Sequence, residues 1–260
     1  MNIAILTPNR LQSILLINNL VASGYAPKLV LFHVKKSKPS KVKAFKQALR
    51  ALLFFWRIDQ KIRRIKIRNE RLAQAIITGF AQKKGLQRTL SEGIPTIEIA
   101  SVNSQQTIDA LRANQIDILF IWGVPIIKPE ILGAVRQQVI NAHTSLLPHY
   151  RGSQVEFWMF YYRDFKYAGV TFHQVDSGVD TGDIIMQIQA DDTDFSCPEV
   201  LRAHNSTRVI AHLPKVLQAI DFGNHTPLAQ KNLAATTHKT FTFRDITMKH
   251  IVEVYCADRR

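Results

Sequence analysis

The sequence predicts an α/β protein with a Rossmann-like, open, mainly parallel sheet, helices on both faces and a short C-terminal extension. Three observations predict this fold class. Short apolar runs of strand length alternate with segments of helical periodicity, as in parallel sheets joined by crossover helices. The 260 residues suffice for one large α/β domain or a domain with a small appendage. The composition, 46% hydrophobic and 21% charged, is that of a globular chain rather than a disordered one.

The first β-α-β unit occupies the N-terminal 34 residues. Residues 2–7 form an apolar run typical of a buried strand, 11–22 have helical periodicity and end near Gly24, and 28–34 predict a second strand. The turn between the first strand and the helix, Thr7-Pro8-Asn9-Arg10, is not a Gly-x-Gly-x-x-Gly loop. The first turn therefore argues against a dinucleotide-dependent enzyme.

A basic segment follows at about residues 39–88. Apolar residues recur there at helical spacing from Pro39 to about Phe80, which predicts one long amphipathic helix or two successive ones. Residues 35–88 contain 17 Lys and Arg against two acidic residues, a local balance of +15, whereas the rest of the chain is about neutral and the whole chain has a net charge of +14.

Three interpretations of the basic helix stay open. It can be a solvated amphipathic helix packed on the domain. It can associate with a membrane surface, because the run Leu52-Leu53-Phe54-Phe55-Trp56 between Lys and Arg residues suits an anionic interface. It can also contact the phosphates of RNA, which we consider the weakest of the three.

Strands and helices alternate again after the basic segment. Predicted strands lie at residues 96–100, 116–122, 139–143, 167–175 and 183–190. Predicted helices lie at 104–112, with an N-cap near Asn103, and at 128–135, 154–162 and 198–220, the last with a kink or break at Pro214. We expect residues 1–222 to form the main domain, with the basic segment as an insertion. Residues 223–260 are then a short extension packed on it.

The expected location is the cytoplasm, with a peripheral membrane position if the second interpretation of the basic helix holds. The two cysteines, Cys197 and Cys256, are too few for a disulfide framework and are not spaced as metal ligands. The N-terminal apolar run is short and has no basic leader. The sequence also has no run of about 18 apolar residues that would cross a bilayer.

The candidate catalytic residues are Asn141, His143 and Asp180. Asn141 and His143 are two residues apart on a predicted strand, so their side chains share one face of the sheet. They lie near the carboxyl end of that strand, where open α/β sheets bind ligands. Asp180 lies in the turn Gly178-Val179-Asp180-Thr181-Gly182. An amide and an imidazole can stabilise an oxyanion, and a carboxylate can take a proton, so the three groups suit acyl transfer to an amine.

Each of these signals has a simpler structural interpretation. A histidine in a strand is more often structural than catalytic, and an Asp-Thr-Gly-Asp stretch is more often only a turn. The run Ser145-Leu146-Leu147-Pro148 is by itself core followed by a helix breaker. The combination, in this order and with about 40 residues between its two parts, is far more specific than any one member.

The combination resembles the formyltransferase family that uses 10-formyltetrahydrofolate. The shared elements are Asn141-x-His143, the run Ser145–Pro148, the closing Gly152, and Asp180-Thr181-Gly182. The resemblance covers residues 95–190 well and the N-terminal strands loosely. This chain departs from the family in the size of its basic segment, while His149 and Tyr150 stand where the family is variable.

The resemblance implies specific roles. Asn141 and His143 would contact the formyl oxygen, and Asp180 would support proton transfer. The cosubstrate would be 10-formyltetrahydrofolate, with no metal, and its pterin ring would lie between the loop 123–127 and the turn 175–180. The residues expected at this ligand are Val124, Pro125, Ile126, Ile127, Ser145, Leu147, Val175, Asp176, Ser177, Gly178 and Val179.

The acceptor amine is less defined. Within the family, methionyl-tRNA enzymes carry a further, C-terminal barrel domain, and deformylases carry an N-terminal regulatory domain. Glycinamide ribonucleotide enzymes are compact and lack an insertion like the basic segment 39–88. The length of this chain and its segment 240–245 are nearer to enzymes that formylate nucleotide-linked amino sugars for surface polysaccharides. We therefore expect such a sugar as acceptor. Methionyl-tRNA, glycinamide ribonucleotide, water and a non-catalytic scaffolding role are alternatives, and a homodimer is one expected assembly.

Overall fold

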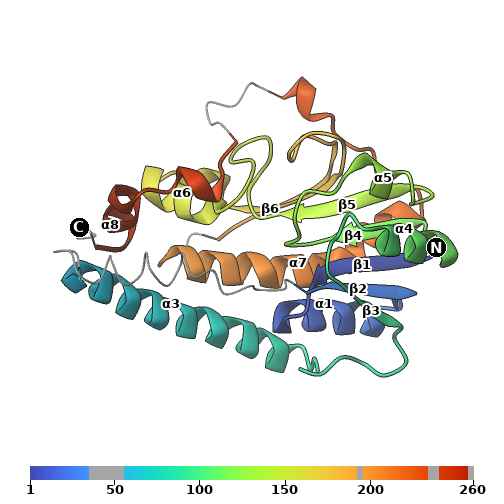
Figure 1. Ribbon diagram of the computed structural model, residues 1–260, viewed down its shortest axis with the longest axis horizontal. Helices are drawn as coiled ribbons and strands as arrows, with labels where there is room; N and C mark the ends of the chain where they lie inside the picture. Colours follow the sequence, from blue (N-terminus) through green and yellow to red (C-terminus); the bar gives the residue numbers. More distant parts are fainter. Residues whose placement is uncertain (35–55, 192–195, 234–239, 257–260) are drawn as a thin grey trace.

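A seven-stranded sheet forms the centre of the protein in the computed structural model, which describes residues 1–34, 56–191, 196–233 and 240–256 (Figure 1). The strands follow the order β3-β2-β1-β4-β5-β6-β7. Those from β3 to β5 are parallel, whereas β6 and β7 are antiparallel to their neighbours. Their bounds are β1 Ile3–Pro8, β2 Leu29–His33, β3 Thr96–Ile99, β4 Ile118–Ile121, β5 Gln138–His143, β6 Gly169–Gln174 and β7 Ile184–Gln189. The predicted open, mainly parallel sheet is confirmed.

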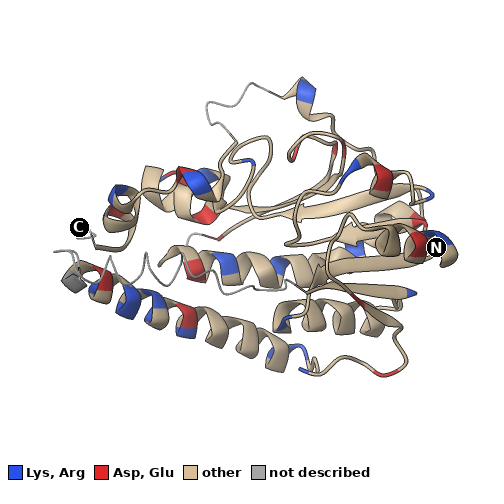
Figure 2. Ribbon diagram, in the orientation of Figure 1, with Lys and Arg blue, Asp and Glu red and all other residues tan. Residues whose placement is uncertain are grey.

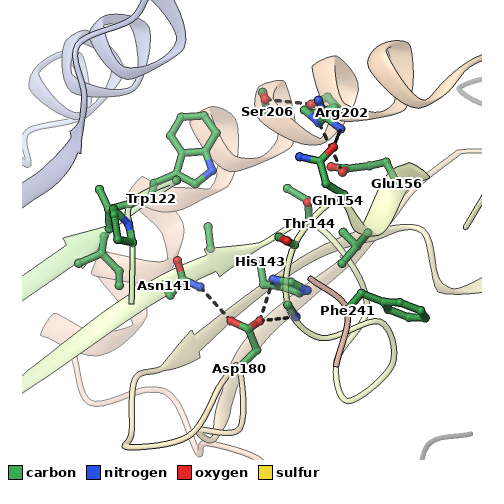
Figure 3. Close-up of a pocket in the computed structure, with 18 of the residues that line it drawn as sticks. Trp122, Asn141, His143, Thr144, Gln154, Glu156, Asp180, Arg202, Ser206 and Phe241 are labelled. Atoms are coloured by element: carbon green, nitrogen blue, oxygen red, sulfur yellow. Dashed lines mark hydrogen bonds and ion pairs between the residues drawn. The ribbon is translucent and has the colours of Figure 1, made fainter. Parts of the chain in front are cut away.

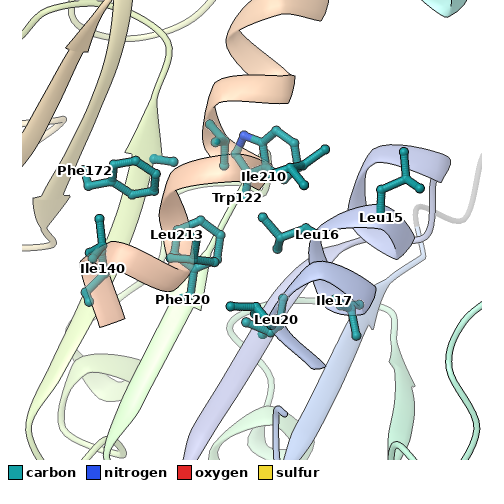
Figure 4. Close-up of a cluster of buried hydrophobic side chains, with 14 of the residues drawn as sticks. Leu15, Leu16, Ile17, Leu20, Phe120, Trp122, Ile140, Phe172, Ile210 and Leu213 are labelled. Carbon is teal, nitrogen blue, oxygen red and sulfur yellow. The ribbon is translucent and has the colours of Figure 1, made fainter. Parts of the chain in front are cut away.

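Helices cover both faces of this sheet, as predicted. Their bounds are α1 Leu11–Ala22, α3 Trp56–Lys83, α4 Gln105–Ala113, α5 Pro129–Leu132, α6 Val155–Tyr162, α7 Pro198–Asp221 and α8 Met248–Cys256. On one face, buried side chains of α1 and α7 pack over the central strands, for example Leu16 and Leu213 over Phe120 (Figure 4). On the other face, Leu111 of α4 and Ile131 of α5 belong to a second buried cluster.

Several predicted boundaries differ from the structure at their ends. The helix predicted at 104–112 is α4, whose N-cap is Ser104 and not Asn103, because the Ser104 hydroxyl accepts a hydrogen bond from the Thr107 amide at 3.3 Å. The strand predicted at 116–122 pairs as a ladder only over Ile118–Ile121. The helix predicted at 128–135 is the single turn Pro129–Leu132, which ends at Gly133.

A kink or break was predicted at Pro214, and the break does not occur, because α7 continues from Pro198 to Asp221. A proline inside a helix cannot donate to the carbonyl four residues before it, which here belongs to Ile210. The side chain of Asn19 in α1 supplies the missing partner, since its Nδ2 donates to the Ile210 oxygen at 2.7 Å. A contact between helices distant in sequence thus satisfies the carbonyl that the proline leaves free.

The basic segment contains the long helix α3, which runs beside α7 (Figure 1). Helical structure predicted for residues 39–55 lies outside the described residues. On α3, Ile62, Ala73 and Ile77 are buried. Lys and Arg residues recur along the helix (Figure 2), and Lys61, Arg64 and Arg68 among others are exposed. The amphipathic pattern therefore packs α3 onto the domain with a basic face toward solvent.

The described residues after Gly223 pack against the main sheet and helices. The backbone of Leu228 exchanges two hydrogen bonds with Ile184 in β7, at 2.9 and 2.8 Å. Phe241 and Val254 are buried in a third apolar cluster with Trp158 of α6. Within the described part of the chain, no helix has the length and apolar character needed to cross a membrane.

Candidate active site

A cavity of about 730 Å³ opens at the carboxyl ends of β4 and β5. Its walls come from the loop after β4, the end of β5, the start of α6, the turn after β6, one side of α3 and α7, and the tail at 240–242. Figure 3 shows that the labelled polar residues come from opposite sides of this space. This is the edge at which open α/β sheets bind their ligands.

Strand alternation sets the direction of the two β5 side chains. Val139 lies in the core beneath α4 and α5, so Asn141 and His143, at two and four residues further on, emerge on the same face. The antiparallel neighbour β6 places His173 opposite Asn141 and Thr171 opposite His143. Two adjacent strands thus present four polar side chains on one face of a largely apolar sheet.

Asp180 brings its carboxylate to this polar group, as the sequence led us to expect (Figure 3). Its Oδ2 lies 3.5 Å from His143 Nδ1, and its Oδ1 lies 3.5 Å from Asn141 Nδ2. The backbone N–H of Gly152 donates to Oδ2 at 2.8 Å. The three predicted side chains therefore meet, although about 40 residues separate the strand from the turn.

The hydrogen bonds of His143 fix which ring nitrogen faces Asp180. His143 Nε2 lies 2.8 Å from the backbone oxygen of Tyr150. Because a carbonyl only accepts, Nε2 must carry a hydrogen there. Nδ1 is left facing the Asp180 carboxylate. A proton on Nδ1 would lie beside the Asp180 carboxylate. It could also be donated to a substrate oxygen on which negative charge develops.

His173 belongs to the same cluster and was missed from the sequence. It is 2% exposed, and its Nδ1 lies 2.7 Å from the Gln174 carbonyl oxygen. Its Nε2 lies 3.1 Å from Asn141 Nδ2 and 3.6 Å from Asp180 Oδ1. The sequence did show two polar residues, Thr171 and His173, at alternate positions of the predicted strand 167–175. It did not show the antiparallel register that places His173 opposite Asn141.

The environment of Asp180 keeps it ionised. Burial raises the pKa of this carboxyl group, but the charge of His143, a hydrogen bond from His173 and the Gly152 N–H lower it by more. The net result is a pKa well below that of an ordinary aspartate. Asp180 is thus a carboxylate at neutral pH and can act only as a proton acceptor or an electrostatic partner.

Most residues predicted to contact the cofactor line the cavity. Beside the catalytic group lie Val124, Pro125, Ile126, Ile127, Val175, Asp176, Gly178 and Val179. Ser145 and Leu147 do not face the cavity. They are 0% and 2% exposed, and the Ser145 hydroxyl donates to the backbone oxygens of His149 and Tyr150. Ser177 is also outside the cavity lining.

A second, polar arm of the cavity is built by α6 and α7 (Figure 3). Arg202 lies 3.5 Å from Oε2 of Glu156 and donates to Gln154 Oε1 at 3.2 Å. The charge of Glu156 raises the pKa of Arg202 against the effect of burial, helped by Glu199. Glu156 is 2% exposed, yet its Oε1 accepts no hydrogen bond from the described residues. A buried carboxylate oxygen without a donor is rare enough to point to a missing partner.

Arg10, at the turn between β1 and α1, stands across this arm. Its guanidinium lies 4.9 Å from the centre of the Trp122 ring. Partial burial and the positive charge of Arg202 lower the pKa of Arg10. Among the described residues, no carboxylate forms an ion pair with it. These two guanidinium groups were not singled out in the sequence, because nothing local distinguishes them from surface arginines.

Together, the open α/β sheet and its amide–imidazole–carboxylate cluster define a group-transfer site. The described residues contain no group of three or more His, Cys, Asp or Glu that could hold a metal ion. The family model described as "Formyl transferase" matches residues 59–205, which is more than half of the chain. The chain therefore belongs to the formyl transferase family, and the resemblance of its motifs is confirmed.

Individual relatives in this family differ in acceptor. A methionyl-tRNA formyltransferase of Lachnospira eligens is 30% identical over 162 residues, covering 58% of this chain and 50% of the relative. This chain thus spans about half the length of that curated relative. A sugar N-formyltransferase from Shewanella superposes with a TM-score of 0.59 at 14% identity, over 98% of this chain and 87% of the other. Glycinamide ribonucleotide transformylase 1 from Symbiobacterium toebii gives 0.57 at 17% identity, over 88% and 94%. At these identities the two structures support the fold alone.

Proposed function

We propose that this protein transfers a formyl group from 10-formyltetrahydrofolate to a primary amine, most specifically that of a nucleotide-linked amino sugar. The observation that carries the proposal is the meeting of Asn141, His143 and Asp180 at one end of the cavity. Family membership supports formyl transfer, and the two arms of the cavity suit the folate and the amine acceptor respectively.

The cluster suits direct attack of an amine on the formyl carbon. The amine nitrogen forms a bond to that carbon, and negative charge develops on the formyl oxygen. Asn141 Nδ2 and a protonated His143 Nδ1 can donate to this oxygen. Asp180 takes the proton released by the amine, directly or through one water. When the tetrahedral intermediate collapses, the bond from carbon to N10 of the folate breaks and N10 receives a proton.

The loop after β4 and the turn after β6 suit the pterin. Val124, Ile127 and Val179 give the two sides of this arm an apolar character. A flat heterocycle can lie between them and bond to backbone groups of the same loops. Its formyl group would then reach the Asn141–His143–Asp180 cluster.

The polar arm suits an acceptor that carries both an anionic group and hydroxyl or N–H donors. Arg10 offers a positive charge that no described carboxylate pairs with, which favours a phosphate. Glu156 offers an unpartnered carboxylate oxygen, which favours a donor. A nucleotide-linked amino sugar supplies both within one small molecule. Glycinamide ribonucleotide also carries a phosphate and hydroxyls and is a close alternative.

A second candidate acceptor, methionyl-tRNA, is favoured by a different observation. One side of α3 lines the cavity through Ala73, Gln74 and Ile77, while its other side exposes Lys and Arg. Phosphates of a bound tRNA could reach this basic face while its amine entered the cavity.

The deciding experiment is release of tetrahydrofolate from 10-formyltetrahydrofolate in the presence of different acceptors. The panel is dTDP- and UDP-linked amino sugars, glycinamide ribonucleotide and methionyl-tRNA, each with a control lacking acceptor. We expect release with an amino sugar nucleotide, and formamide formation on the sugar by mass spectrometry. Equal release without any acceptor would instead indicate a hydrolase, and release with methionyl-tRNA alone would overturn the sugar assignment.

The catalytic roles are tested by His143→Ala and Asp180→Ala. Each should lower kcat by about 10²–10⁴-fold, the range for loss of a positioned acid–base group, while circular dichroism shows a folded protein. Asp191→Ala, at an exposed carboxylate 85% accessible in its side chain, is the control and should keep normal turnover. Normal kcat in either active-site variant would refute the proposed roles.

A further inference from the structure

Gln230 lies in the C-terminal extension, outside the segment 59–205 that matches the family model. It is 4% exposed, and its side-chain amide is fully used. Its Nε2 donates to the backbone oxygens of Asp180 at 3.1 Å and Gly182 at 2.6 Å. Its Oε1 accepts from Arg151 Nη2 at 2.8 Å. One buried side chain of the tail thus joins the turn that carries Asp180 to the loop that follows β5.

The turn at Asp180 has a backbone conformation that needs outside support. Asp180 has a φ of +53°, in the left-handed region that residues other than glycine rarely adopt. Gly182, two residues later, fits only because it has no side chain, since an added Cβ would lie 2.0 Å from the Gln174 oxygen. The two carbonyls that Gln230 binds are those of Asp180 itself and of Gly182, so its hydrogen bonds hold the peptide units that directly follow Asp180 in this turn.

Gln230 also steadies the partner of the Asp180 carboxylate. The Gly152 N–H donates to Asp180 Oδ2, and Arg151 is the residue immediately before it. A second contact of the tail acts on the same loop. The Phe241 N–H donates to the Arg151 oxygen at 3.0 Å, and the Ser153 N–H donates to the Phe241 oxygen at 2.9 Å. A Cβ on Gly152 would lie 2.0 Å from that Phe241 oxygen, so the close approach requires glycine.

We propose that Gln230 is a positioning residue that aims the Asp180 carboxylate at His143, so that the C-terminal extension completes the active site. The inference rests on the proposed function of Asp180. Gln230 acts on the geometry of the site. Its loss leaves Asp180 in the site but lets the turn relax, which moves the carboxylate relative to His143 and Gly152. Misplacement of a catalytic group by about 1 Å can cost roughly 10²-fold in rate.

Two substitutions test this role. Gln230→Ala removes all three hydrogen bonds. Gln230→Glu keeps the shape and an acceptor for Arg151, but has no N–H for the two carbonyls of the turn. We expect both to lower kcat by about 10–100-fold, with 10-formyltetrahydrofolate and the dTDP- or UDP-linked amino sugar that the panel selects. The affinity for 5-formyltetrahydrofolate, measured by calorimetry, should change by less than about threefold, because the apolar arm is intact.

A matched control separates positioning from general loosening of the tail. Val254→Ala removes a buried contact of α8, 6% exposed, that does not touch the turn. All variants are assayed well below their melting temperatures. The inference predicts reduced kcat for both Gln230 variants and normal kcat for Val254→Ala at a similar loss of melting temperature. It is overturned if Gln230→Glu keeps kcat within about twofold of the wild type, or if Val254→Ala loses as much as Gln230→Ala.

Asp180→Asn distinguishes failure of this inference from failure of the proposed function. An inactive Asp180→Asn beside fully active Gln230 variants would refute the role of Gln230 alone. A fully active Asp180→Asn would refute both, because Gln230 could then have no catalytic group to position.

Discussion

At the scale of single residues, the site depends on a carboxylate that is held ionised while nearly buried. Asp180 is 13% exposed in its side chain and is surrounded by two histidines, an amide and a backbone N–H. These groups stabilise the ionised form, so its pKa is lower in the folded than in the unfolded chain. Asp180 therefore contributes to stability as well as to the proposed chemistry.

The pH dependence of this contribution has a definite sign. With the folded pKa depressed, the stabilisation is fully present above the unfolded carboxyl value of about 4 and is lost as the pH falls from there toward the folded value. We expect Asp180→Asn to lower the free energy of unfolding at about pH 7, and this difference from wild type to shrink at about pH 3. Urea denaturation at both values measures it. A difference between Asp180→Asn and wild type that stays constant from about pH 7 to about pH 3 would contradict the depressed pKa of Asp180.

Residue patterns identified three members of the cluster but not its full extent. Asn141, His143 and Asp180 carry a recognisable spacing. His173 is recognisable only once β6 is known to run antiparallel to β5. Glu156 and Arg202 pair across 46 residues between two helices, which no local pattern encodes.

At the scale of elements, the fold depends on contacts between helices that supply hydrogen-bond donors missing from one helix alone. Helix α7 forms the floor of the polar arm through Arg202, and it tolerates Pro214 because Asn19 of α1 satisfies the Ile210 carbonyl. Ile210 is fully buried, so water cannot take the place of that donor. The prediction of a break failed because it considered α7 alone.

The Asn19–Pro214 relation gives a double-mutant prediction. Asn19→Ala should cost about 1–3 kcal/mol of unfolding free energy, because it leaves a buried carbonyl without a donor. In a Pro214→Ala background, residue 214 regains an N–H for that carbonyl, so the cost of Asn19→Ala should fall by about 1 kcal/mol or more. Thermal or urea denaturation of the four proteins gives the coupling. Additive effects would show that Asn19 does not compensate for the proline.

The C-terminal extension is an element whose sequence alone suggested only a packed tail. In the structure its described residues supply Gln230 to the Asp180 turn, the Phe241 backbone to the Gly152 loop, and part of the cavity lining. Gly152 belongs to the family motif, and the structure explains why glycine is needed there. The backbone oxygen of Phe241, about 90 residues later in the chain, leaves no room for a side chain.

At the scale of the whole molecule, charge is distributed very unevenly. The basic segment 35–88 carries a balance of +15 in a chain of net charge +14. Lys and Arg residues recur along its described helix α3 (Figure 2), and several of them are exposed. Helix α3 also lines the cavity, through Glu70, Ala73, Gln74 and Ile77. We propose that the protein is cytoplasmic and that the basic face of α3 adsorbs to anionic membranes, near the assembly of surface glycans.

Liposome flotation tests the membrane proposal. Each basic residue near an anionic surface contributes about 1 kcal/mol, so we expect flotation with phosphatidylserine vesicles at low salt and release at high salt. Neutral phosphatidylcholine vesicles serve as the control. A combined Lys61→Gln, Arg64→Gln and Arg68→Gln variant should float less while keeping its fold. A protein that stays unbound at low salt would rule the proposal out, and competition by tRNA at that salt would favour an RNA role.

The sequence by itself predicted an open, mainly parallel sheet, the succession of strands and helices along the chain, and the Asn141–His143–Asp180 motif. Apolar periodicity and strand alternation are local properties, and each predicts which side of an element is buried. Only the tertiary structure decided what surrounds that motif. Four contacts of this kind join residues far apart in the chain. They are the pairing of His173 with Asn141, the Glu156–Arg202 ion pair, the hydrogen bond from Asn19 to Ile210, and the hydrogen bond from Gln230 to Asp180. Such pairings depend on how the elements pack, and packing is a property of the whole molecule rather than of any segment.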